Sequence, residues 1–258
     1  MQKAVLITGC SSGIGLVAAQ DLQNRGYRVL AACRKAADLE HLQQLGFETI
    51  ELDLDDKTSV ARAAAKVIEL TGNRLYGLFN NAGYGVYGPL HTTSREQFEQ
   101  QFSTNLFGTH QLTQLLLPAM LAHAEGRIIL TSSILGLITM PNRGIYGASK
   151  YALEAWSDAL RMELHGTGIK VSIIEPGPLS SKFADNVKQT QSDKPIFNSA
   201  MTERFTLTSE AVLPKLRHAL ESPRPKLRYP VTFIAHVVSV LKRLLPGRLI
   251  DILVRGNS

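Results

Sequence analysis

The chain has 258 residues, of which 44% are hydrophobic and 19% are charged, and its formal net charge is +6. A chain of this length and apolar content can bury one sizeable core, so we expect a single domain over residues 1–258. No apolar run reaches the ~18–20 residues of a membrane-spanning helix. The two cysteines, Cys10 and Cys33, and the scattered histidines fit neither a disulfide framework nor a metal site. We therefore expect no metal and a reducing, cytoplasmic environment.

The N-terminal segment predicts a phosphate-binding turn. Residues Ala4–Thr8 form an apolar run typical of a buried strand, and the glycine-rich segment from Gly9 to Gly15 leads from it into a helical pattern that begins at Leu16. A strand, a glycine-rich turn and a helix N-terminus in this order place backbone N–H groups around a phosphate. The alternative is a tight turn that binds no ligand.

Beyond this turn, short apolar runs alternate with helical patterns, which predicts a doubly wound, parallel α/β sheet of the Rossmann type. The further predicted strands are Arg28–Ala32, Thr49–Leu52, Leu75–Asn80, Arg127–Thr131 and Lys170–Glu175. A capping-box pattern from Ser94 to Gln97 predicts the start of a long helix that carries Asn105. We expect Pro118 to kink or shorten the end of that helix.

The pair Tyr146 and Lys150 is the most informative chemical signal. Residues four apart share one face of a helix, so the Lys150 ammonium would lie beside the Tyr146 phenol and favour its deprotonation. A tyrosine has a pKa near ~10, and a fixed cation beside it makes it usable as a general acid and base at neutral pH. Ser133 lies thirteen positions upstream, and Asn105 lies further back. Taken singly, each of these four residues could have a purely structural role.

Together these motifs resemble the short-chain dehydrogenase/reductase family, and the resemblance covers nearly the whole chain. The motifs that carry it, in family order and spacing, are Thr8-Gly9-x-x-x-Gly13-x-Gly15, Asp53, Asn80-Asn81-Ala82-Gly83, Asn105, Ser133, Tyr146-x-x-x-Lys150 and Pro176-Gly177. Within the family, the glycine-rich turn and the segment 31–35 are most similar to the branch of 17β-hydroxysteroid and retinol dehydrogenases.

The resemblance implies an oxidoreductase that moves a hydride between a nicotinamide and a carbonyl carbon. Tyr146 would exchange the proton on the substrate oxygen, and Ser133 would donate a hydrogen bond to the same oxygen. Lys150 would assist Tyr146 and hold the nicotinamide ribose, while Asn105 would hold a water that connects Lys150 to solvent. The residues expected to bind the cofactor are Gly9, Ser11, Ser12, Gly13, Ile14, Gly15, Arg34, Asp53, Asn81, Ala82, Gly83, Tyr146, Lys150, Pro176 and Gly177.

The end of the second predicted strand favours NADP(H) over NAD(H). A carboxylate at this place would bind a ribose diol and repel a 2′-phosphate, but Cys33 stands there, followed by Arg34 and Lys35. The serines of the glycine-rich turn, Ser11 and Ser12, can add hydroxyl donors to the phosphate. The alternative is that the two cations are simply solvated at a helix start.

Two further cofactor contacts have structural alternatives of their own. Asp53 resembles the family acid that hydrogen-bonds the adenine edge, but it could equally cap a helix that begins near Asp55. The segment 81–83 would bring its backbone against the adenosine ribose, or it is simply a turn after the fourth strand. After Pro176-Gly177 the family usually has a threonine four residues beyond the glycine, where this chain has Ser181.

The expected substrate is a lipophilic aldehyde, ketone or alcohol, because an apolar pocket with few polar anchors favours such a ligand. The residues expected to line it are Tyr84, Val86, Tyr87, Ile134, Leu135, Leu137, Met140 and Leu179. Residues from about 180 to 208 are predicted to form a substrate loop, or else a plain surface connection. A catalytically silent regulatory protein on the same fold is an alternative function. A sugar-nucleotide lyase or epimerase is another, although the chain has little room for the extra domain.

The C-terminal segment, residues 209–258, is predicted to be helical and basic. From Ala211 onward nine basic residues face two acidic ones, a net charge of +7, whereas residues 1–210 carry about −1. The apolar run from Val231 to Leu241 suits helices that lie in a membrane interface, or helices that cover the substrate pocket or a subunit interface. No aromatic-interleaved basic motif indicates nucleic-acid binding. The family resemblance suggests a homodimer or homotetramer through the helices carrying Asn105 and Tyr146.

Overall fold

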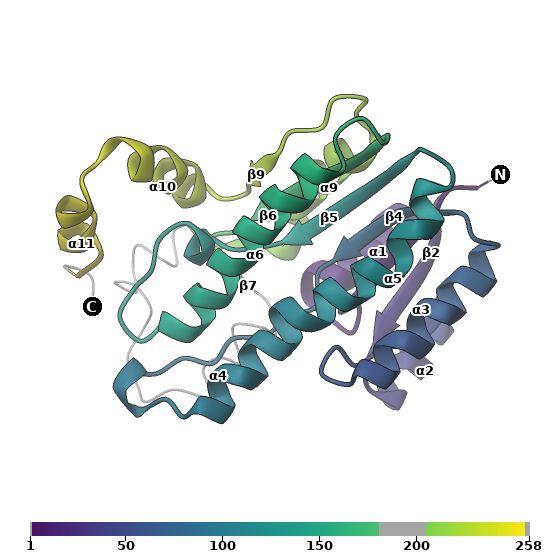
Figure 1. Ribbon diagram of the computed structural model, residues 1–258, viewed down its shortest axis with the longest axis horizontal. Helices are drawn as coiled ribbons and strands as arrows, with labels where there is room; N and C mark the ends of the chain where they lie inside the picture. Colours follow the sequence, from purple (N-terminus) through teal and green to yellow (C-terminus); the bar gives the residue numbers. More distant parts are fainter. Residues whose placement is uncertain (1, 181–204, 256–258) are drawn as a thin grey trace.

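The computed structural model describes residues 2–180 and 205–255, and its centre is a seven-stranded sheet in the order β3-β2-β1-β4-β5-β6-β9 (Figure 1). Every neighbouring pair is parallel. The strands are β1 (Ala4–Thr8), β2 (Arg28–Cys33), β3 (Glu48–Glu51), β4 (Leu75–Asn80), β5 (Gly126–Thr131), β6 (Ile169–Glu175) and β9 (Arg228–Pro230). This confirms the predicted Rossmann-type sheet, with a strand-order reversal between β1 and β4. The seventh strand, β9, was not predicted.

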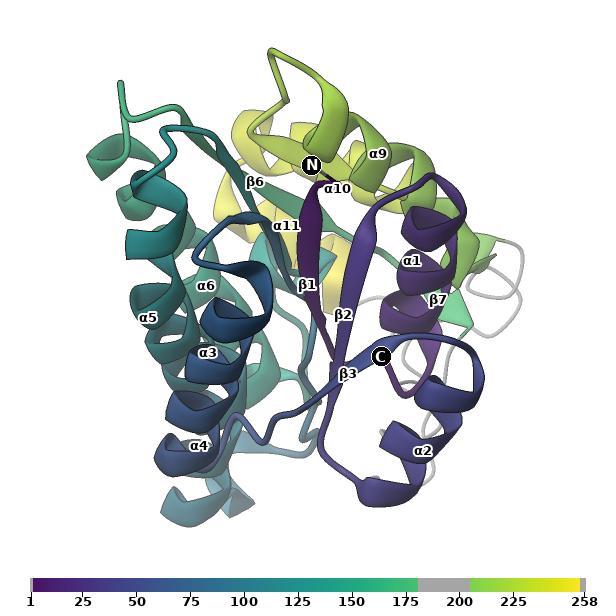
Figure 2. The ribbon, with the colours of Figure 1, turned by 90° about the vertical axis from the view of Figure 1, so that its right-hand side faces the viewer.

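Helices cover both faces of the sheet, and Figure 2 shows the two layers edge-on. One layer contains α1 (Gly13–Asn24), α2 (Ala36–Gln44) and α9 (Leu213–Glu221), and the other contains α3 (Lys57–Thr71), α5 (Thr109–Leu121) and α6 (Gly144–Glu163). Alternate residues of β1 serve alternate layers: Val5 packs toward α1, and Leu6 packs toward α3. Because both faces are buried, the strands read as continuous apolar runs.

The long helix predicted from Ser94 forms and carries Asn105, but it contains a π-helical turn. Its capping box is present, since Ser94 Oγ accepts from Gln97 N at 3.3 Å and Gln97 Oε1 accepts from Ser94 N at 3.0 Å. However, α4 (Arg95–Phe102) gives way to a π-helical turn, η2 (Ser103–Gly108), before α5 begins. Pro118 lies inside the last turn of α5, close to its end. A single π turn re-aims the side chains that it carries, and Asn105 is one of them.

The C-terminal part of the chain is helical, as predicted, but it also contributes β9 to the sheet. After β9 come α10 (Phe233–Leu244) and α11 (Gly247–Arg255), at the end of the molecule toward which the strands point (Figure 1). Most of the predicted substrate loop, residues 181–204, lies outside the described residues. At its two ends, β7 (Leu179–Ser180) pairs with β8 (Leu207–Thr208). Among the described helices, none has the length and hydropathy needed to cross a membrane.

Candidate active site

The glycine-rich turn between β1 and α1 is packed so closely that side chains are excluded. A Cβ on Gly15 would overlap the carbonyl oxygen of Gly9, and a Cβ on Gly9 would lie 2.9 Å from the Cα of Ala82. Gly9 and Gly13 have φ values of 74° and 56°, in the region that favours glycine.

This turn fits an anionic phosphate. The N-cap of α1 is Ser12, whose side chain does not cap the helix. The first-turn N–H groups of α1 therefore lack intrahelical partners beside a backbone that can be approached closely. Ser11, Ser12 and Ile14 all lie in this turn or at the start of α1.

Thr8 holds this turn to the segment after β4, a role that the sequence did not reveal. Its Oγ1 accepts hydrogen bonds from the backbone N–H groups of Asn81 and Ala82, both at 2.9 Å. The Asn81 amide in turn donates to the Thr8 carbonyl at 3.0 Å and accepts from Thr131 Oγ1 at 3.1 Å. The carboxyl ends of β1, β4 and β5 are thereby joined. The place where they meet is the topological switch point, where open α/β sheets bind ligands.

The end of β2 carries the cations that the sequence singled out. Cys33 is buried as the last residue of β2, whereas Arg34 and Lys35 are exposed, and Lys35 is the N-cap of α2. Asp53 does not cap a helix: α3 begins at Lys57, two residues later than expected, and its N-cap is Asp56. Asp53 instead accepts a hydrogen bond from the backbone N–H of Asp55 at 3.1 Å.

The four predicted catalytic residues come from three elements. Asn105 lies on the π-helical turn η2, Ser133 follows β5 as the N-cap of the 3-10 turn η3 (Ile134–Gly136), and Tyr146 and Lys150 lie in the first turns of α6. All four side chains are buried. Lys150 Nζ lies 5.7 Å from the centroid of the Tyr146 ring, and Ser133 is a hydrogen-bond partner of Tyr146.

Backbone carbonyls and amides hold Lys150 and Asn105 in place. Lys150 Nζ donates to the carbonyl oxygen of Thr131 at 2.8 Å. The Asn105 amide donates to Ser149 Oγ at 3.0 Å and to the Tyr84 carbonyl at 3.1 Å, and it accepts from Tyr84 N at 3.1 Å. A Cβ on Gly83 would lie 3.0 Å from Asn105 Oδ1, so the segment 81–83 packs directly against this residue.

Burial dominates the electrostatics of the pair on α6. It lowers the pKa of Lys150 to about 8, against an opposing effect of the Glu154 carboxylate. Burial also raises the pKa of Tyr146, with a further contribution from Tyr87, while the hydrogen bond with Ser133 acts in the opposite direction. The sequence predicted that Lys150 would favour ionisation of Tyr146. In the structure, desolvation of the phenolate outweighs any such effect.

The Pro176-Gly177 turn connects β6 to this site. The Pro176 carbonyl accepts from Ile134 N at 2.8 Å, next to Ser133. A Cβ on Gly177 would overlap the hydroxyl of Thr232, the N-cap of α10. The turn therefore fits closely between the catalytic segment and the C-terminal helices. Ser181, predicted to act just beyond it, lies outside the described residues.

Tyr146 belongs to an apolar cluster. The cluster consists of Tyr87, Ile134, Leu135, Ile138, Met140 and Tyr146, with Ile234, Val238 and Ile250 packed onto it. Tyr87, Ile134, Leu135 and Met140 were predicted to line the substrate site, whereas Ile138 and the side chains from α10 and α11 were missed because no local pattern places them there. Three other predicted lining residues are not members of this cluster: Tyr84, Val86 and Leu137. Leu179 belongs to a different part of the core.

Arg143 is a further residue that the sequence did not identify. It is 3% exposed, and its guanidinium lies 3.8 Å over the ring of Tyr87, which itself meets Tyr146 edge-on at 5.6 Å between ring centroids. Arg143 stands three residues before Tyr146, and this proximity is the one signal that could have drawn attention to it.

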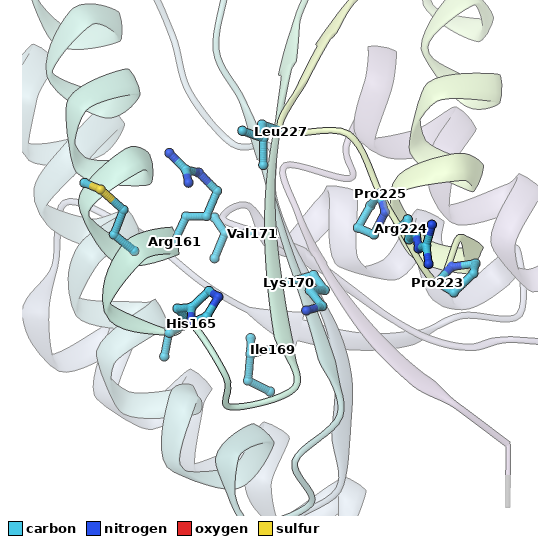
Figure 3. Close-up of a pocket in the computed structure, with 11 residues that line it drawn as sticks. Arg161, His165, Ile169, Lys170, Val171, Pro223, Arg224, Pro225 and Leu227 are labelled. Atoms are coloured by element: carbon cyan, nitrogen blue, oxygen red, sulfur yellow. The ribbon is translucent and has the colours of Figure 1, made fainter.

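A cleft of about 450 Å³ lies away from these residues (Figure 3). Its walls come from the end of α6, the start of β6 and the segment 223–227 that precedes β9. The start of β6 lies at the opposite edge of the sheet from the carboxyl ends of the strands. The cleft is therefore not part of the candidate site.

A glycine-rich cradle at the switch point of a parallel sheet, beside a buried Ser-Tyr-Lys group, defines an oxidoreductase of the dinucleotide-binding type. A family model for short chain dehydrogenases matches residues 3–192. The chain belongs to the short-chain dehydrogenase family.

Individual relatives agree with this assignment. The chain is 63% identical to the uncharacterized oxidoreductase YbbO of Escherichia coli K12 over 99% of this chain and 95% of that protein. It is 34% identical to 17-beta-hydroxysteroid dehydrogenase type 6 of Rattus norvegicus (97% and 87% covered). It is 32% identical to the NADPH-dependent 3-dehydrocapnine reductase of Ornithobacterium rhinotracheale (95% and 94% covered). A crystal structure of a short-chain dehydrogenase from Streptomyces avermitilis superposes with a TM-score of 0.80 at 28% identity, with 94% of each chain covered.

Proposed function

We propose that the protein transfers a hydride between NADP(H) and a lipophilic aldehyde or ketone, or the corresponding alcohol, with Tyr146 as general acid and base. The observation that carries this proposal is the position of the buried Ser133-Tyr146-Lys150 group against an apolar cluster that includes Tyr87 and Met140. An apolar wall next to the proton donor favours a carbonyl compound without charged groups near the reacting carbon.

When bound, the nicotinamide supplies or accepts the hydride. Residues of the chain itself would bind the substrate oxygen and exchange its proton. Ser133 and Tyr146 direct hydroxyl groups to the substrate oxygen, which stabilises the negative charge that develops on it during reduction. Tyr146 then gives up its proton to that oxygen. Lys150 favours the resulting phenolate, and Asn105 holds the neighbouring backbone at Tyr84 in place.

NADP(H) is the cofactor that fits the residues around the cradle. Arg34 and Lys35 are exposed at the end of β2, and Cys33 supplies no carboxylate that would repel a 2′-phosphate. The relative from Ornithobacterium rhinotracheale is NADPH-dependent by name, which agrees with this choice. The buried thiols of Cys10 and Cys33 are free, which fits the cytoplasm as the proposed location.

The proposed homodimer or homotetramer would form through the helices that carry Asn105 and Tyr146. Large apolar side chains are exposed along these helices: Phe98, Phe107, Leu115, Tyr151 and Met162. Their burial between subunits would remove a substantial apolar area from water.

The test is oxidation of NADPH by the purified protein with a panel of aldehydes and ketones, with uridine-diphosphate sugars as negative control. Tyr146→Phe should abolish reduction while NADPH still binds, because only the proton donor is lost. A variant that retained a substantial fraction of the wild-type turnover would show that Tyr146 is not the general acid. A wild-type protein that bound NADPH and reduced no member of the panel would favour the catalytically silent alternative.

A further inference from the structure

The outer face of α10 carries an apolar stripe that residues 2–180 and 205–255 leave exposed. Phe233, Val237, Val240 and Leu244 are spaced four, three and four residues apart, which places them in one line along the helix. Val237 is half-buried, but Phe233 is 65%, Val240 55% and Leu244 72% exposed. The ring of Phe205 stacks on Phe233 without hiding it.

The opposite face of α10 is packed against the body of the protein. Ile234 and Val238 pack on the apolar cluster around Tyr146, and Ala235 is completely buried. The helix is therefore apolar on two sides, whereas packing on this cluster requires only one. On α11, the helix that follows α10, Leu249 and Ile252 are also exposed, by 47% and 65%.

Basic side chains accompany this surface. Lys242 and Arg243 are exposed at the end of α10, and Arg248 is exposed at the start of α11. Lys242 donates a hydrogen bond to the hydroxyl of Tyr151 at 2.6 Å, whereas Arg243 and Arg248 are exposed, and the charge of Arg243 also lowers the pKa of the buried Glu175 carboxyl. The sequence of α10 contains no acidic residue, and α11 contains one, Asp251.

We propose that this face, formed by Phe233, Val240, Leu244, Leu249 and Ile252 with Arg243 and Arg248, docks on the surface of a bilayer of anionic phospholipids. Exposed apolar side chains flanked by cations are what an amphipathic helix needs to lie in a headgroup region. A second copy of the chain is a poor occupant, because it would bring a segment with the same net charge of +7 against this one.

Docking through this face would bring the candidate site close to the bilayer, and this step rests on the proposed function. Figure 1 shows α10 and α11 together at the end of the molecule where the strands terminate, which is the edge that carries the candidate site. Because the inner side of α10 packs on the apolar cluster at Tyr146, a bilayer on its outer side would lie close to the apolar residues that are proposed to bind the substrate. A lipophilic substrate could then enter from the membrane.

The test is co-sedimentation of the full-length protein with vesicles of phosphatidylcholine alone or with added phosphatidylglycerol. The protein should bind the anionic vesicles at low salt and leave them as salt rises. Leu244→Ser with Ile252→Ser should weaken binding at least about tenfold. Arg243→Gln with Arg248→Gln should also weaken it roughly tenfold or more.

Matched controls separate this face from the rest of the surface. Leu45→Ser removes an apolar side chain that is 40% exposed at the end of α2, and Lys57→Gln with Arg62→Gln removes two exposed cations on α3. Neither change should alter vesicle binding, and thermal unfolding should show that all variants are folded. Tyr146→Phe should bind vesicles like the wild type, so a failure of the proposed catalysis would not disturb this measurement.

Three results would overturn the proposal: no binding to anionic vesicles at low salt, equal loss of binding in the control variants, or a change from dimer to monomer caused by Leu244→Ser with Ile252→Ser. The last result would identify the face as an interface between copies of the chain.

Discussion

Lys150 lies in surroundings that oppose its own charge. Its side chain is 4% exposed, and burial lowers its pKa to about 8, with the carboxylate of Glu154 one helical turn away acting in the opposite direction. The pKa of Tyr146 is raised by burial as well. As pH rises from neutrality, Lys150 is therefore the first member of the catalytic group to lose a proton. Perturbed pKa values of this kind are typical of active sites.

This order of deprotonation predicts the alkaline limb of the pH profile. The rate of carbonyl reduction should fall above pH 8, because the ammonium that favours the Tyr146 phenolate is lost. Glu154→Gln should move that limb to lower pH by roughly half a unit, since the nearby negative charge is removed. Asp158→Asn is the control, as Asp158 does not contribute to the Lys150 shift. A limb that stayed at the same pH in Glu154→Gln would contradict the role given to Lys150.

Arg34 and Cys33 should determine which nicotinamide cofactor the protein prefers. Cys33→Asp with Arg34→Ala should shift the ratio of kcat/KM values from NADPH toward NADH by about tenfold or more, because it removes one charge-assisted contact and adds repulsion. Arg62→Ala, an exposed cation on α3, serves as the control. Equal efficiency of the wild-type protein with both cofactors would remove the basis of this prediction.

Among the elements, the junction of α4 and the π-helical turn η2 fixes the loop that follows β4. The side-chain amides of two buried residues, Gln101 and Asn105, hold this loop. Gln101 donates to the Tyr84 carbonyl at 2.7 Å and accepts from Val86 N at 2.7 Å, while Asn105 makes hydrogen bonds to both backbone groups of Tyr84. The loop 84–86 has no regular secondary structure, so its backbone groups depend on these side chains.

Gln101→Leu should therefore lower the free energy of unfolding by about 1–2 kcal/mol, because it leaves the half-buried N–H of Val86 without a partner and the Tyr84 carbonyl with Asn105 as its only partner among the described side chains. Chemical denaturation of the purified variant measures this change. The exposed neighbour Gln100 gives the matched control, Gln100→Leu, for which only a small effect is expected. If the two variants were equally stable, the loop would not depend on Gln101.

Across the whole molecule, Arg228 joins the C-terminal segment to the catalytic helix. From β9 it forms ion pairs with Glu154 at 3.1 Å and Asp158 at 2.7 Å on α6, and with Glu175 at 3.2 Å at the end of β6. One cation thus faces three carboxylates, of which Glu154 and Glu175 are buried. Burial and the neighbouring acids raise the pKa of Glu175 to about 7.

A carboxyl group whose pKa is raised in the folded state binds its proton more tightly there than in the unfolded chain. Glu175 should therefore reduce stability as pH rises from about 4.5 to 7, and the reduction should persist above that range. Glu175→Gln should be more stable than the wild type at pH 8 by roughly 1–3 kcal/mol, and the difference should vanish near pH 4. Denaturant unfolding across this pH range measures it.

Glu48→Gln serves as the comparison, because its effect on stability should have the opposite sign. The side-chain hydrogen bond from Arg28 lowers the pKa of Glu48 in the folded state, so removal of this carboxylate should reduce stability at neutral pH. An identical pH dependence in both variants would show that Glu175 does not titrate as described.

The sequence alone determined those features that depend on residues close together in the chain. The strands β1 and β4 fall on the predicted residues, and the capping box at Ser94 forms as predicted, because apolar runs and caps act locally. The spacing of Tyr146 and Lys150 likewise fixed their common helix. The sequence also indicated the cations at the end of β2 and the basic character of the C-terminal segment.

The tertiary structure decided what depends on residues far apart in the chain. No local pattern shows that β9 joins β6, that Thr8 holds the segment 81–82, or that α10 packs on the apolar cluster around Tyr146. Nor does spacing show the direction in which the pKa of Tyr146 moves. That direction follows from desolvation, which is set by side chains that fold around the phenol from η3, α6 and the loop that contains Tyr87.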